Sequence, residues 1–561
     1  MITPGLRGFV LDTPFGDDED PVQDLPPAVF TALSQAFTPV QELSMPRTQR
    51  RVYLDTFDWR LYRAGLVLEL EQARSGGRLL LTKADGTPQA EQSVTGWPPR
   101  RPGLASDLPP GPVRDRVAVL AGPRALLPVV KAASTVSVTR LLNSDGKTVA
   151  RLIADRSTVT SPAPSAGGTT TAVLPLRLFV AEVRGYPGQA RRAACLLAGL
   201  PGAAHAGPGL FAAGLAALGR HPAEYVSGVD AEITATMPAA TAVARLLLRM
   251  LDTLEQNVDG VLRDIDTEFL HDLRVAVRRT RSAIKLLGEV LPPDLAAHYA
   301  AEFKWLGDLT TPTRDLDVHL LGFDAMAGRL RATSAADLEP FRIFLARRRT
   351  REFRRLAAAL RGPRFRALTD DWRKALLEIR DAGAPQPARP RSARSGPRRR
   401  RSLTAATLAT VTTGRAFRRI VAQGRAITSE SAPESLHNLR KRAKELRYLL
   451  EFFAPLHDPV AYRKVVGDLK QLQDCLGDFQ DSQVQREELQ TMAGQMLTAG
   501  AAPAATLLAM GEIAVNLADS QAEARDDFAR RFARFAGPAG QQRVAVLLAG
   551  PEDAAPDGAA G

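Results

Sequence analysis

The amino-acid sequence predicts an α+β multidomain protein, with a β-rich domain first and an all-α domain after it. At 561 residues, the chain is longer than one average domain. Up to about residue 220, short segments are separated by Gly, Asp, Asn and Pro, which is typical of strands and turns. From Met237 onward, long segments rich in Ala, Leu and Arg repeat their apolar residues with the period of a helix.

Six segments of the first domain carry the strand pattern. Each one is β-branched or alternates apolar and polar residues, and turn-forming residues flank it. The predicted strands are 51–56, 65–70, 78–83, 136–142, 148–155 and 176–183. Residues 188–200 are predicted to form a helix.

Changes in composition set the expected domain boundaries. The first domain is expected over 1–222, a linker over 223–237 and the helical domain over 238–537. The last residues, 538–561, are expected to form a disordered tail, because their final stretch is rich in Ala, Gly, Pro and Asp.

A stretch rich in Pro and Arg, residues 382–401, is predicted to be a linker inside the helical domain. It would separate two halves at about 238–385 and 402–537. The predicted helices are 239–263, 267–290, 295–310, 314–330, 335–360, 364–381, 402–427, 433–454, 459–476, 479–497 and 504–534.

The positive charge is concentrated in the helical domain. The chain has a net charge of +13, and residues 241–540 alone hold 49 Lys and Arg against 37 Asp and Glu. The block 341–420 is the most basic, with 23 basic and 5 acidic residues, and it forms either solvated helix faces or a longer path for an anion. A field of this sign favours polyanions as partners.

Two classes of protein are excluded by composition. The chain has two cysteines, Cys195 and Cys475, which provide neither a disulfide framework nor a cysteine metal cluster. The first residues lack a secretory signal pattern, and no apolar run is long enough to span a membrane. We therefore expect a soluble, cytoplasmic protein without a membrane partner.

One predicted helix, 271–287, carries a row of cations directly beside its apolar face. The apolar row is Leu273, Val277, Thr280, Ile284 and Leu287, and the row one residue ahead is His271, Arg274, Arg278, Arg281 and Lys285. Ordinary amphipathic helices place charges of both signs opposite their apolar face. A single sign at the edge of the core predicts a charged groove that holds an anion.

The same row recurs 166 residues later. The second copy consists of His437, Arg440, Lys444 and Arg447, and the same offset places Lys470 on Lys304 and Asp481 on Asp315. One position breaks the match, because Lys285 corresponds to Glu451. This internal duplication predicts two similar halves with approximate two-fold symmetry, whose cation rows face a common cavity.

The duplicated pattern H-x-L-R-x-x-x-R/K-x-x-R, followed by Arg314, Asp315 and Asp317, resembles the CHAD domain, the conserved-histidine α-helical domain. The resemblance covers roughly residues 238–537. It implies two pseudo-symmetric four-helix halves that bind inorganic polyphosphate. The binding residues would be His271, Arg274, Arg278, Arg281, Lys285, Lys304, His437, Arg440, Lys444, Arg447 and Lys470.

The first domain resembles the CYTH, or triphosphate tunnel, family. The matching segment runs from Tyr53 to Thr56 and continues from Leu61 to Gly65, while Lys83, Arg140 and Asp155 fall where that family has tunnel residues. The resemblance implies an antiparallel β-barrel. In the family, Arg and Lys bind a triphosphate, and the acids of an E-x-E-x-K strand bind Mg²⁺ or Mn²⁺.

This chain lacks the E-x-E-x-K strand. Its one E-x-E is Glu69-Leu70-Glu71, where the family usually carries arginines, and the closing strand retains only Glu182 and Arg184. Without acidic ligands the metal would be poorly held, so we expect a degenerate tunnel in which Lys83 and Arg140 are vestigial phosphate ligands.

The preferred interpretation is polyphosphate binding without catalysis and without a required cofactor. Such binding would recruit the protein to polyphosphate granules. Two alternatives stay open: a metal-dependent triphosphatase in the first domain, and a nucleic-acid-binding helical protein. The two histidines would donate hydrogen bonds to phosphate or add charge below pH ~6.5. A metal site at the cation rows is not expected, since each row has one histidine without a carboxylate or cysteine at ligand spacing. The oligomeric state is not predicted.

Overall fold

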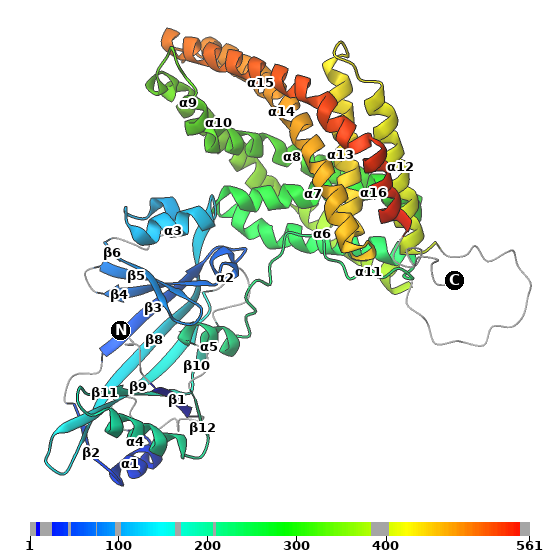
Figure 1. Ribbon diagram of the computed structural model, residues 1–561. Helices are drawn as coiled ribbons and strands as arrows, with labels where there is room; N and C mark the ends of the chain where they lie inside the picture. Colours follow the sequence, from blue (N-terminus) through cyan, green and yellow to red (C-terminus); the bar gives the residue numbers. More distant parts are fainter. Residues whose placement is uncertain are drawn as a thin grey trace, which may run out of the picture. The chain divides into compact units, whose positions relative to one another are not determined.

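The computed structural model describes residues 7–11, 25–42, 47–73, 76–95, 102–162, 170–205, 209–382 and 403–549. The chain divides into two compact units, Met1–Val226 and Ser227–Gly561, and the division falls inside the predicted linker. The first unit is an antiparallel sheet with a few short helices, and the second is helical throughout (Figure 1). This confirms the predicted fold class.

The first unit is built on one large sheet. Nine strands follow the order β12-β1-β11-β9-β8-β3-β4-β5-β6, and β2, β7 and β10 pair at its margins. The strands are β1 (Arg7–Leu11), β2 (Thr38–Gln41), β3 (Arg47–Asp55), β4 (Leu66–Ala73), β5 (Gly76–Lys83), β6 (Pro88–Val94), β7 (Gly103–Leu104), β8 (Ala125–Leu142), β9 (Thr148–Thr160), β10 (Thr171–Val173), β11 (Leu176–Glu182) and β12 (Ala203–His205). The helices are α1 (Pro27–Ser34), α2 (Arg60–Arg63), α3 (Pro112–Ala121), α4 (Pro187–Ala198) and α5 (Leu210–Ala217).

The predicted closed barrel is not formed by the described residues, because β6 and β12 remain the two edges of the sheet. A physical reason is visible at β6. The side-chain amide of Gln92 donates to the carbonyl of Pro109 at 2.7 Å and accepts from the backbone N–H of Val113 at 3.2 Å. These bonds hold the start of α3 on the face of the sheet where Leu79 and Val94 lie, so after β6 the chain returns over that face instead of adding a further strand at the edge.

The two faces of this sheet differ. On one face, α1 and α4 pack on β1, β8, β9 and β11, and α3 packs on the strands from β3 to β6. On the other face, α5 lies against β8 and β9, where Leu210, Phe211 and Leu215 join Val130 and Val159 in a smaller cluster. The rest of this second face is polar and is described below.

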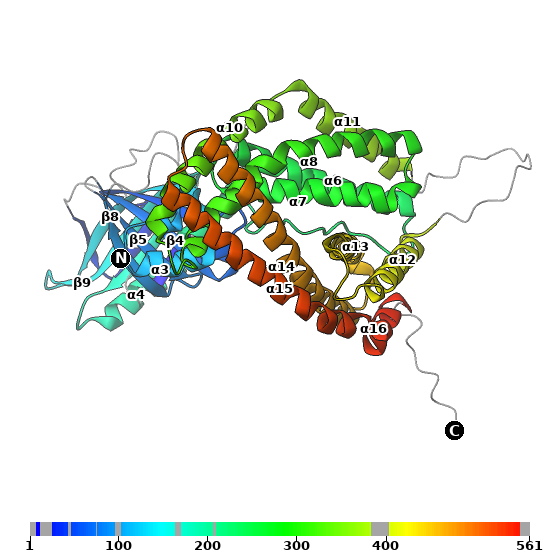
Figure 2. The same cartoon turned by 90° about the horizontal axis from the view of Figure 1, so that it is seen from above.

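The second unit consists of long helices. They are α6 (Ala239–Leu262), α7 (Thr267–Leu287), α8 (Pro293–Leu321), α9 (Phe323–Ala327), α10 (Glu339–Leu360), α11 (Pro363–Ala382), α12 (Ala405–Arg425), α13 (Pro433–Phe452), α14 (Pro459–Thr498), α15 (Ala504–Ala536) and α16 (Pro538–Ala549). The helices α6, α7, α8 and α11 lie together on one side and α12, α13, α14 and α16 on the other, as Figure 2 shows from above. Most of the predicted inner linker, 382–401, lies outside the described residues.

In the structure, two predicted breaks between helices lie inside continuous helices. The segment 295–310 and the start of 314–330 share α8, which continues through Pro312 to Leu321, and the rest of 314–330 contains α9. The segments 459–476 and 479–497 share α14. Pro312 cannot donate to the carbonyl four residues earlier, which predicts a break. The helix nevertheless continues, because packing against α7 and α10 outweighs the local preference.

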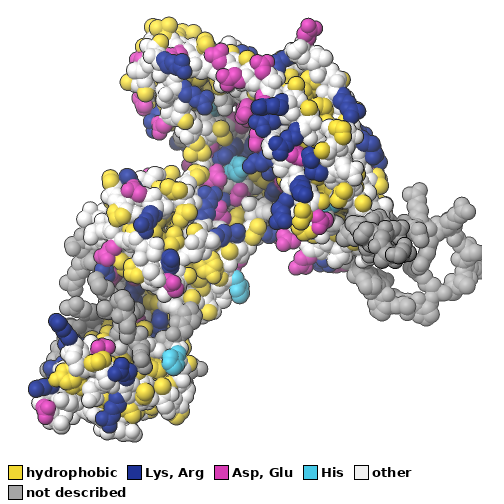
Figure 3. Space-filling model, in the orientation of Figure 1, with side chains coloured by type: hydrophobic (Ala, Val, Ile, Leu, Met, Phe, Trp, Pro, Cys, Tyr) yellow, Lys and Arg dark blue, Asp and Glu magenta, His cyan; other side chains and the backbone are white. Residues whose placement is uncertain are grey.

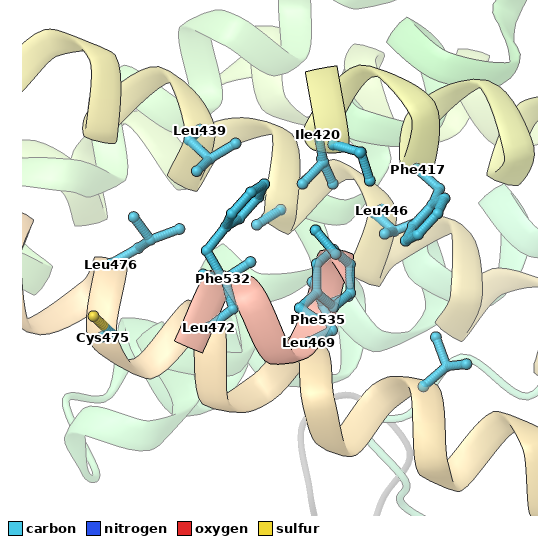
Figure 4. Close-up of a cluster of buried hydrophobic side chains, with 14 of the residues drawn as sticks. Phe417, Ile420, Leu439, Leu446, Leu469, Leu472, Cys475, Leu476, Phe532 and Phe535 are labelled. Carbon is cyan, nitrogen blue, oxygen red and sulfur yellow. The ribbon is translucent and has the colours of Figure 1, made fainter. Parts of the chain in front are cut away.

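The prediction of a disordered tail over 538–561 is wrong for its first part, which forms α16. Val544 and Leu547 lie three residues apart on one face of this helix and are buried in the core of the second half. Figure 4 shows that core, in which Phe417 and Phe535 lie beside Leu446 and Leu469. Residues 550–561 lie outside the described part.

Candidate functional site

The two halves of the helical unit are related by an approximate two-fold axis that can be read from their hydrogen bonds. Ala239 donates its backbone N–H to the carbonyl of Leu403, and Ala405 donates to the carbonyl of Met237, both at 2.8 Å. Adding 166 to 237 and 239 gives 403 and 405, so the two bonds are copies of each other. In an isologous interface the two halves use the same surface, so every contact occurs twice, with the roles of the two halves exchanged.

Two ion pairs between α7 and α13 obey the same rule. Lys285 binds Glu445 at 2.6 Å, and Arg279 binds Glu451 at 2.8 Å. Glu445 is the copy of Arg279, and Glu451 is the copy of Lys285. The axis therefore also passes between α7 and α13, the two helices that carry the predicted cation rows.

Each cation row packs against the next helix of its own half in a matched way. Arg274 on α7 donates to the hydroxyls of Thr310 and Thr311 on α8 at 3.2 and 2.7 Å. Its copy, Arg440 on α13, forms an ion pair with Asp481 on α14 at 2.8 Å. Asp481 is the copy of Asp315, whose charge acts on Arg274, so each guanidinium lies against the same stretch of the next helix, with different hydrogen-bond partners.

Arg281 and its copy Arg447 are also in matched surroundings. A side chain at Gly307 on α8 would come within 2.9 Å of the guanidinium of Arg281, so a glycine is needed for this arginine to lie across α8. At the corresponding place, Arg447 donates to the side chain of Gln473 on α14 at 3.4 Å. Gln473 is the copy of Gly307, so the sequence offset and the structure agree at this position of the row.

The centre of the two rows is a crowded group of positive charges, which we call the axial cluster: Arg274, Arg278, Arg314, Arg440 and Lys444. Burial, followed by the charges of Arg440 and Arg278, lowers the pKa of Lys444 to about 8. Because Arg278 belongs to α7 and Lys444 to α13, the two rows face each other across the axis.

The first half shows the same electrostatic strain. Burial lowers the pKa of Arg274, and the charges of Arg278 and Arg314 lower it further, while Asp315 opposes them. Asp315 acts against the repulsion at Arg274, and Asp481 acts against it at Lys444. Arg314 also has an acidic partner, Glu268, at 3.7 Å. On the hollowed face of the helical unit, Figure 3 shows Lys and Arg side chains gathered with fewer acidic ones among them.

The remaining predicted residues have individual partners. Lys304 binds Asp308 at 2.8 Å, and both side chains are exposed. The Nδ1 atom of His437 lies 2.5 Å from Oε1 of Gln480 on α14. His271 is half-buried, and Lys470 is exposed on α14.

Sequence reasoning missed the partners that cross the axis. Arg279, Glu445 and Glu451 were not singled out as a group, although the mismatch of Lys285 with Glu451 was visible. The sequence indicated Arg314 only as part of a motif, and in the structure it belongs to the axial cluster and donates to the carbonyl of Thr267 at 3.0 Å. The sequence signal for these ion pairs is the change of charge between matched positions. It can be interpreted only when the two-fold axis is known.

The polar face of the β unit carries a row of buried side chains across five strands. Arg51 on β3 binds Glu69 on β4 at 3.2 Å and Ser134 on β8 at 3.1 Å. Ser134 in turn shares a hydrogen bond of 2.6 Å with Ser157 on β9, which donates to Asp155 at 2.6 Å. Internal acids and hydroxyls therefore already bind the groups that a tunnel would present to a phosphate.

The row ends at Arg177 on β11, which lies opposite Asp155 in the sheet. Burial lowers the pKa of Arg177, and the charges of Asp155 and Tyr53 oppose this effect. Burial also raises the pKa of Tyr53 well above its ordinary value, with Glu69 as the next cause. The face thus holds two arginines and two carboxylic acids in one network.

The structure does not bring the predicted tunnel residues together. Lys83 is exposed at the end of β5 and pairs with Leu66, so it lies on the face of the sheet opposite to Glu69. Arg140 lies on the same face as Ser134, but six residues further along β8, about 20 Å away. Only Asp155 belongs to the polar row.

The described residues of the β unit do not fit a divalent metal. Gly8 and Val10 occupy the positions of β1 that face the polar row, because Val10 lies opposite Arg177. Glu71 binds Arg78 at 2.6 Å, and Glu182 is exposed. Across the described part of the chain, no group of three or more His, Cys, Asp or Glu side chains is placed to hold a metal ion.

No helix in the described ranges combines the length and apolarity needed to cross a bilayer.

Comparisons with known proteins gave matches that cover about half of the chain or less. The crystal structure of the CHAD domain from the plant Ricinus communis is 25% identical, with a TM-score of 0.44, over 54% of this chain and 95% of that chain. PptA from Streptomyces chartreusis is 16% identical, with a TM-score of 0.38, over 53% and 99%. A search of curated proteins gives no match. The family model of the CHAD domain matches residues 245–490, and this part of the chain is therefore a CHAD domain.

Proposed function

We propose that the helical unit binds inorganic polyphosphate through the axial cluster. The observation that carries the proposal is the charge crowding around Lys444, whose pKa is lowered to about 8 by burial and by Arg440 and Arg278. Partly buried cations that repel one another cost folding free energy. A bound polyanion removes that cost, because charge-assisted hydrogen bonds to phosphate are among the strongest polar contacts in proteins.

The arrangement of aromatic residues favours polyphosphate over single-stranded nucleic acid. A protein that binds single strands stacks bases on open aromatic rings. Two aromatic residues lie near the predicted rows, and both are engaged: the guanidinium of Arg364 covers Trp305 at 4.1 Å, and Tyr448 stacks on Phe452 at 6.1 Å. A ligand of phosphates alone needs no such rings.

The contacts divide the predicted residues into two sets. Arg274, Arg278, Arg440 and Lys444, together with Arg281 and Arg447 along the rows, form the proposed binding surface. Arg440 and Arg447 also have acidic partners, Asp481 and Glu451, both at 2.8 Å. Lys285 and Lys304 differ because they are paired with Glu445 and Asp308 and are also 64% and 66% exposed, outside the crowded centre. We therefore assign these two lysines a minor part in binding.

The test is polyphosphate binding by the full chain over a series of salt concentrations, with RNA as competitor. We expect the logarithm of the binding constant to fall linearly with the logarithm of the salt concentration, because counterions are released from the polyanion. RNA at equal phosphate concentration should displace little polyphosphate. Ready displacement by RNA would overturn the proposal and leave a general basic surface.

Binding of this kind would serve to recruit the protein to polyphosphate granules. A fluorescent fusion of the full chain should co-localise with granules in cells that store polyphosphate. The fusion carrying Arg278→Gln and Lys444→Gln should be diffuse, while its expression level stays unchanged and its thermal stability is not lowered. If both fusions co-localise with granules equally, granule association does not depend on the axial cluster.

A further inference from the structure

A cavity of about 220 Å³ lies where the two halves of the helical unit meet, and its lining residues do not include those of the axial cluster. The first half contributes residues of α8 and α9, and the second half contributes residues of α14 and α15. Its apolar wall includes Val318, Met326, Ile513 and Leu517. A volume of this size equals about seven water molecules, which suits a small ligand rather than a protein segment.

The other wall of the cavity is polar. His319 lines it, with its Nε2 atom held by Glu488 of α14 at 2.8 Å. Gln485 and Asn516 also face the cavity. An occupant therefore needs an apolar body and one polar end.

The charge at the mouth of the cavity selects the sign of that polar end. Arg329 lines the cavity, and its side chain is exposed. Within the described ranges, its guanidinium has no hydrogen bond or ion pair, whereas Arg349 of the neighbouring α10 binds both Asp317 and Asp264. Arg329 is thus an available cation beside an apolar cavity.

The rim that carries Arg329 is held in place before any ligand arrives. Asn516 on α15 donates to the carbonyl of Arg329 at 3.4 Å. The carboxylate of Glu512 accepts from the backbone N–H groups of Ala332 and Thr333, both at 3.0 Å. A preordered rim lowers the entropy that binding would otherwise cost.

We infer that this cavity binds a small aliphatic carboxylate of about six carbons, with its chain against the apolar wall and its carboxylate on Arg329. The inference concerns a site separate from the axial cluster, and it does not rest on polyphosphate binding. Its test therefore needs no polyphosphate.

The experiment compares two probes of equal length and opposite charge, hexanoate and hexylammonium, by calorimetric titration of the full chain. Hexanoate should bind with one site per chain, and hexylammonium should bind at least tenfold more weakly. Arg329→Gln should weaken hexanoate binding about tenfold, since it removes one charge-assisted hydrogen bond. Ala325→Leu, which fills space in the cavity lining, should weaken it as well.

The control is Arg347→Gln, which removes the same charge from an exposed position on α10 outside the cavity. It should leave hexanoate binding unchanged. Arg329 and Ala325 are both exposed, so their variants are expected to fold, and near-ultraviolet circular dichroism checks this. Equal affinity for the two probes, or hexanoate binding that neither cavity variant weakens, would overturn the inference.

Discussion

The helices α7 and α13 are copies of one sequence that have kept their charge at some positions and inverted it at others. Arg274, Arg278 and Arg281 have the cationic counterparts Arg440, Lys444 and Arg447. Arg279 and Lys285, in contrast, correspond to Glu445 and Glu451. The retained positions form the proposed binding surface, and the inverted positions form the two ion pairs across the axis.

The difference separates two physical requirements. A single anion lying across a two-fold axis needs the same sign on both sides. An isologous contact between identical halves would instead place each cation against another cation, twice. Inversion of charge in one copy turns both of these contacts into attractions. The pattern of retention and inversion therefore distinguishes ligand-facing positions from positions at the interface of the halves.

The largest effect is expected when the inverted charges are changed back to positive ones. Glu445→Lys with Glu451→Lys would place like charges together at both ion pairs, and Glu445 and Glu451 are only 13% and 18% exposed. We expect a loss of about 3 kcal/mol or more in the free energy of unfolding, measured by urea denaturation. Adding Arg279→Glu and Lys285→Glu should restore part of it, because Glu445 and Glu451 also bind Arg442 and Arg447 on their own helix. A quadruple variant no more stable than the double would show that the ion pairs do not hold the halves together.

The retained positions are tested by ligand binding. Arg278→Gln with Lys444→Gln should weaken polyphosphate binding of the full chain about a hundredfold at low salt, because two charge-assisted contacts are lost. The matched control, Arg347→Gln with Arg354→Gln, removes the same charge from exposed positions of α10. If both pairs of changes weaken binding equally, net charge alone is responsible and the axial cluster has no special part.

The pH dependence of binding tests the part played by Lys444 among the positions that kept their positive charge. The pKa of Lys444 is about 8 in the free protein, so this side chain loses its proton as the pH rises through 8, and it must regain a proton to bind an anion. Affinity should fall about tenfold more between pH 7 and 9 than it does in Lys444→Arg, which stays charged. Parallel pH profiles for the two proteins would contradict this role.

The smallest expected effect is a gain in stability. The folded state lowers the pKa of Lys444 from 10.5 to about 8, so the protonated side chain costs free energy of folding below pH 8. Lys444→Met should stabilise the protein at pH 7 by about 1 kcal/mol, after allowance for solvent screening. The gain should disappear as the pH rises from 8 through 10.5, where the lysine is neutral in both states. Thermal unfolding at pH 7 and 10.5 measures it.

The duplication and the cation rows could be predicted from the sequence because they depend on local spacing and on one offset. The ion pairs across the axis could not be predicted in this way. Their partners are 172 and 160 residues apart, so neither pair joins two residues related by the offset of 166. The polar row of the β unit was missed for a similar reason, because Arg51, Ser134 and Arg177 meet only through strand register. The continuation of α8 through Pro312 and the folding of α16 follow from packing, which local sequence rules do not contain.

The inverted charges across the axis also determine what happens when the chain is divided. A fragment ending at residue 382 presents Arg279 and Lys285, and two such fragments would repel each other in the arrangement that the intact protein uses. A fragment beginning at residue 403 presents two glutamates and meets the same obstacle. Mixed together, the two fragments are complementary. The two halves therefore act as two different, complementary subunits joined in one chain. Their fragments should reassemble with each other and not with copies of themselves.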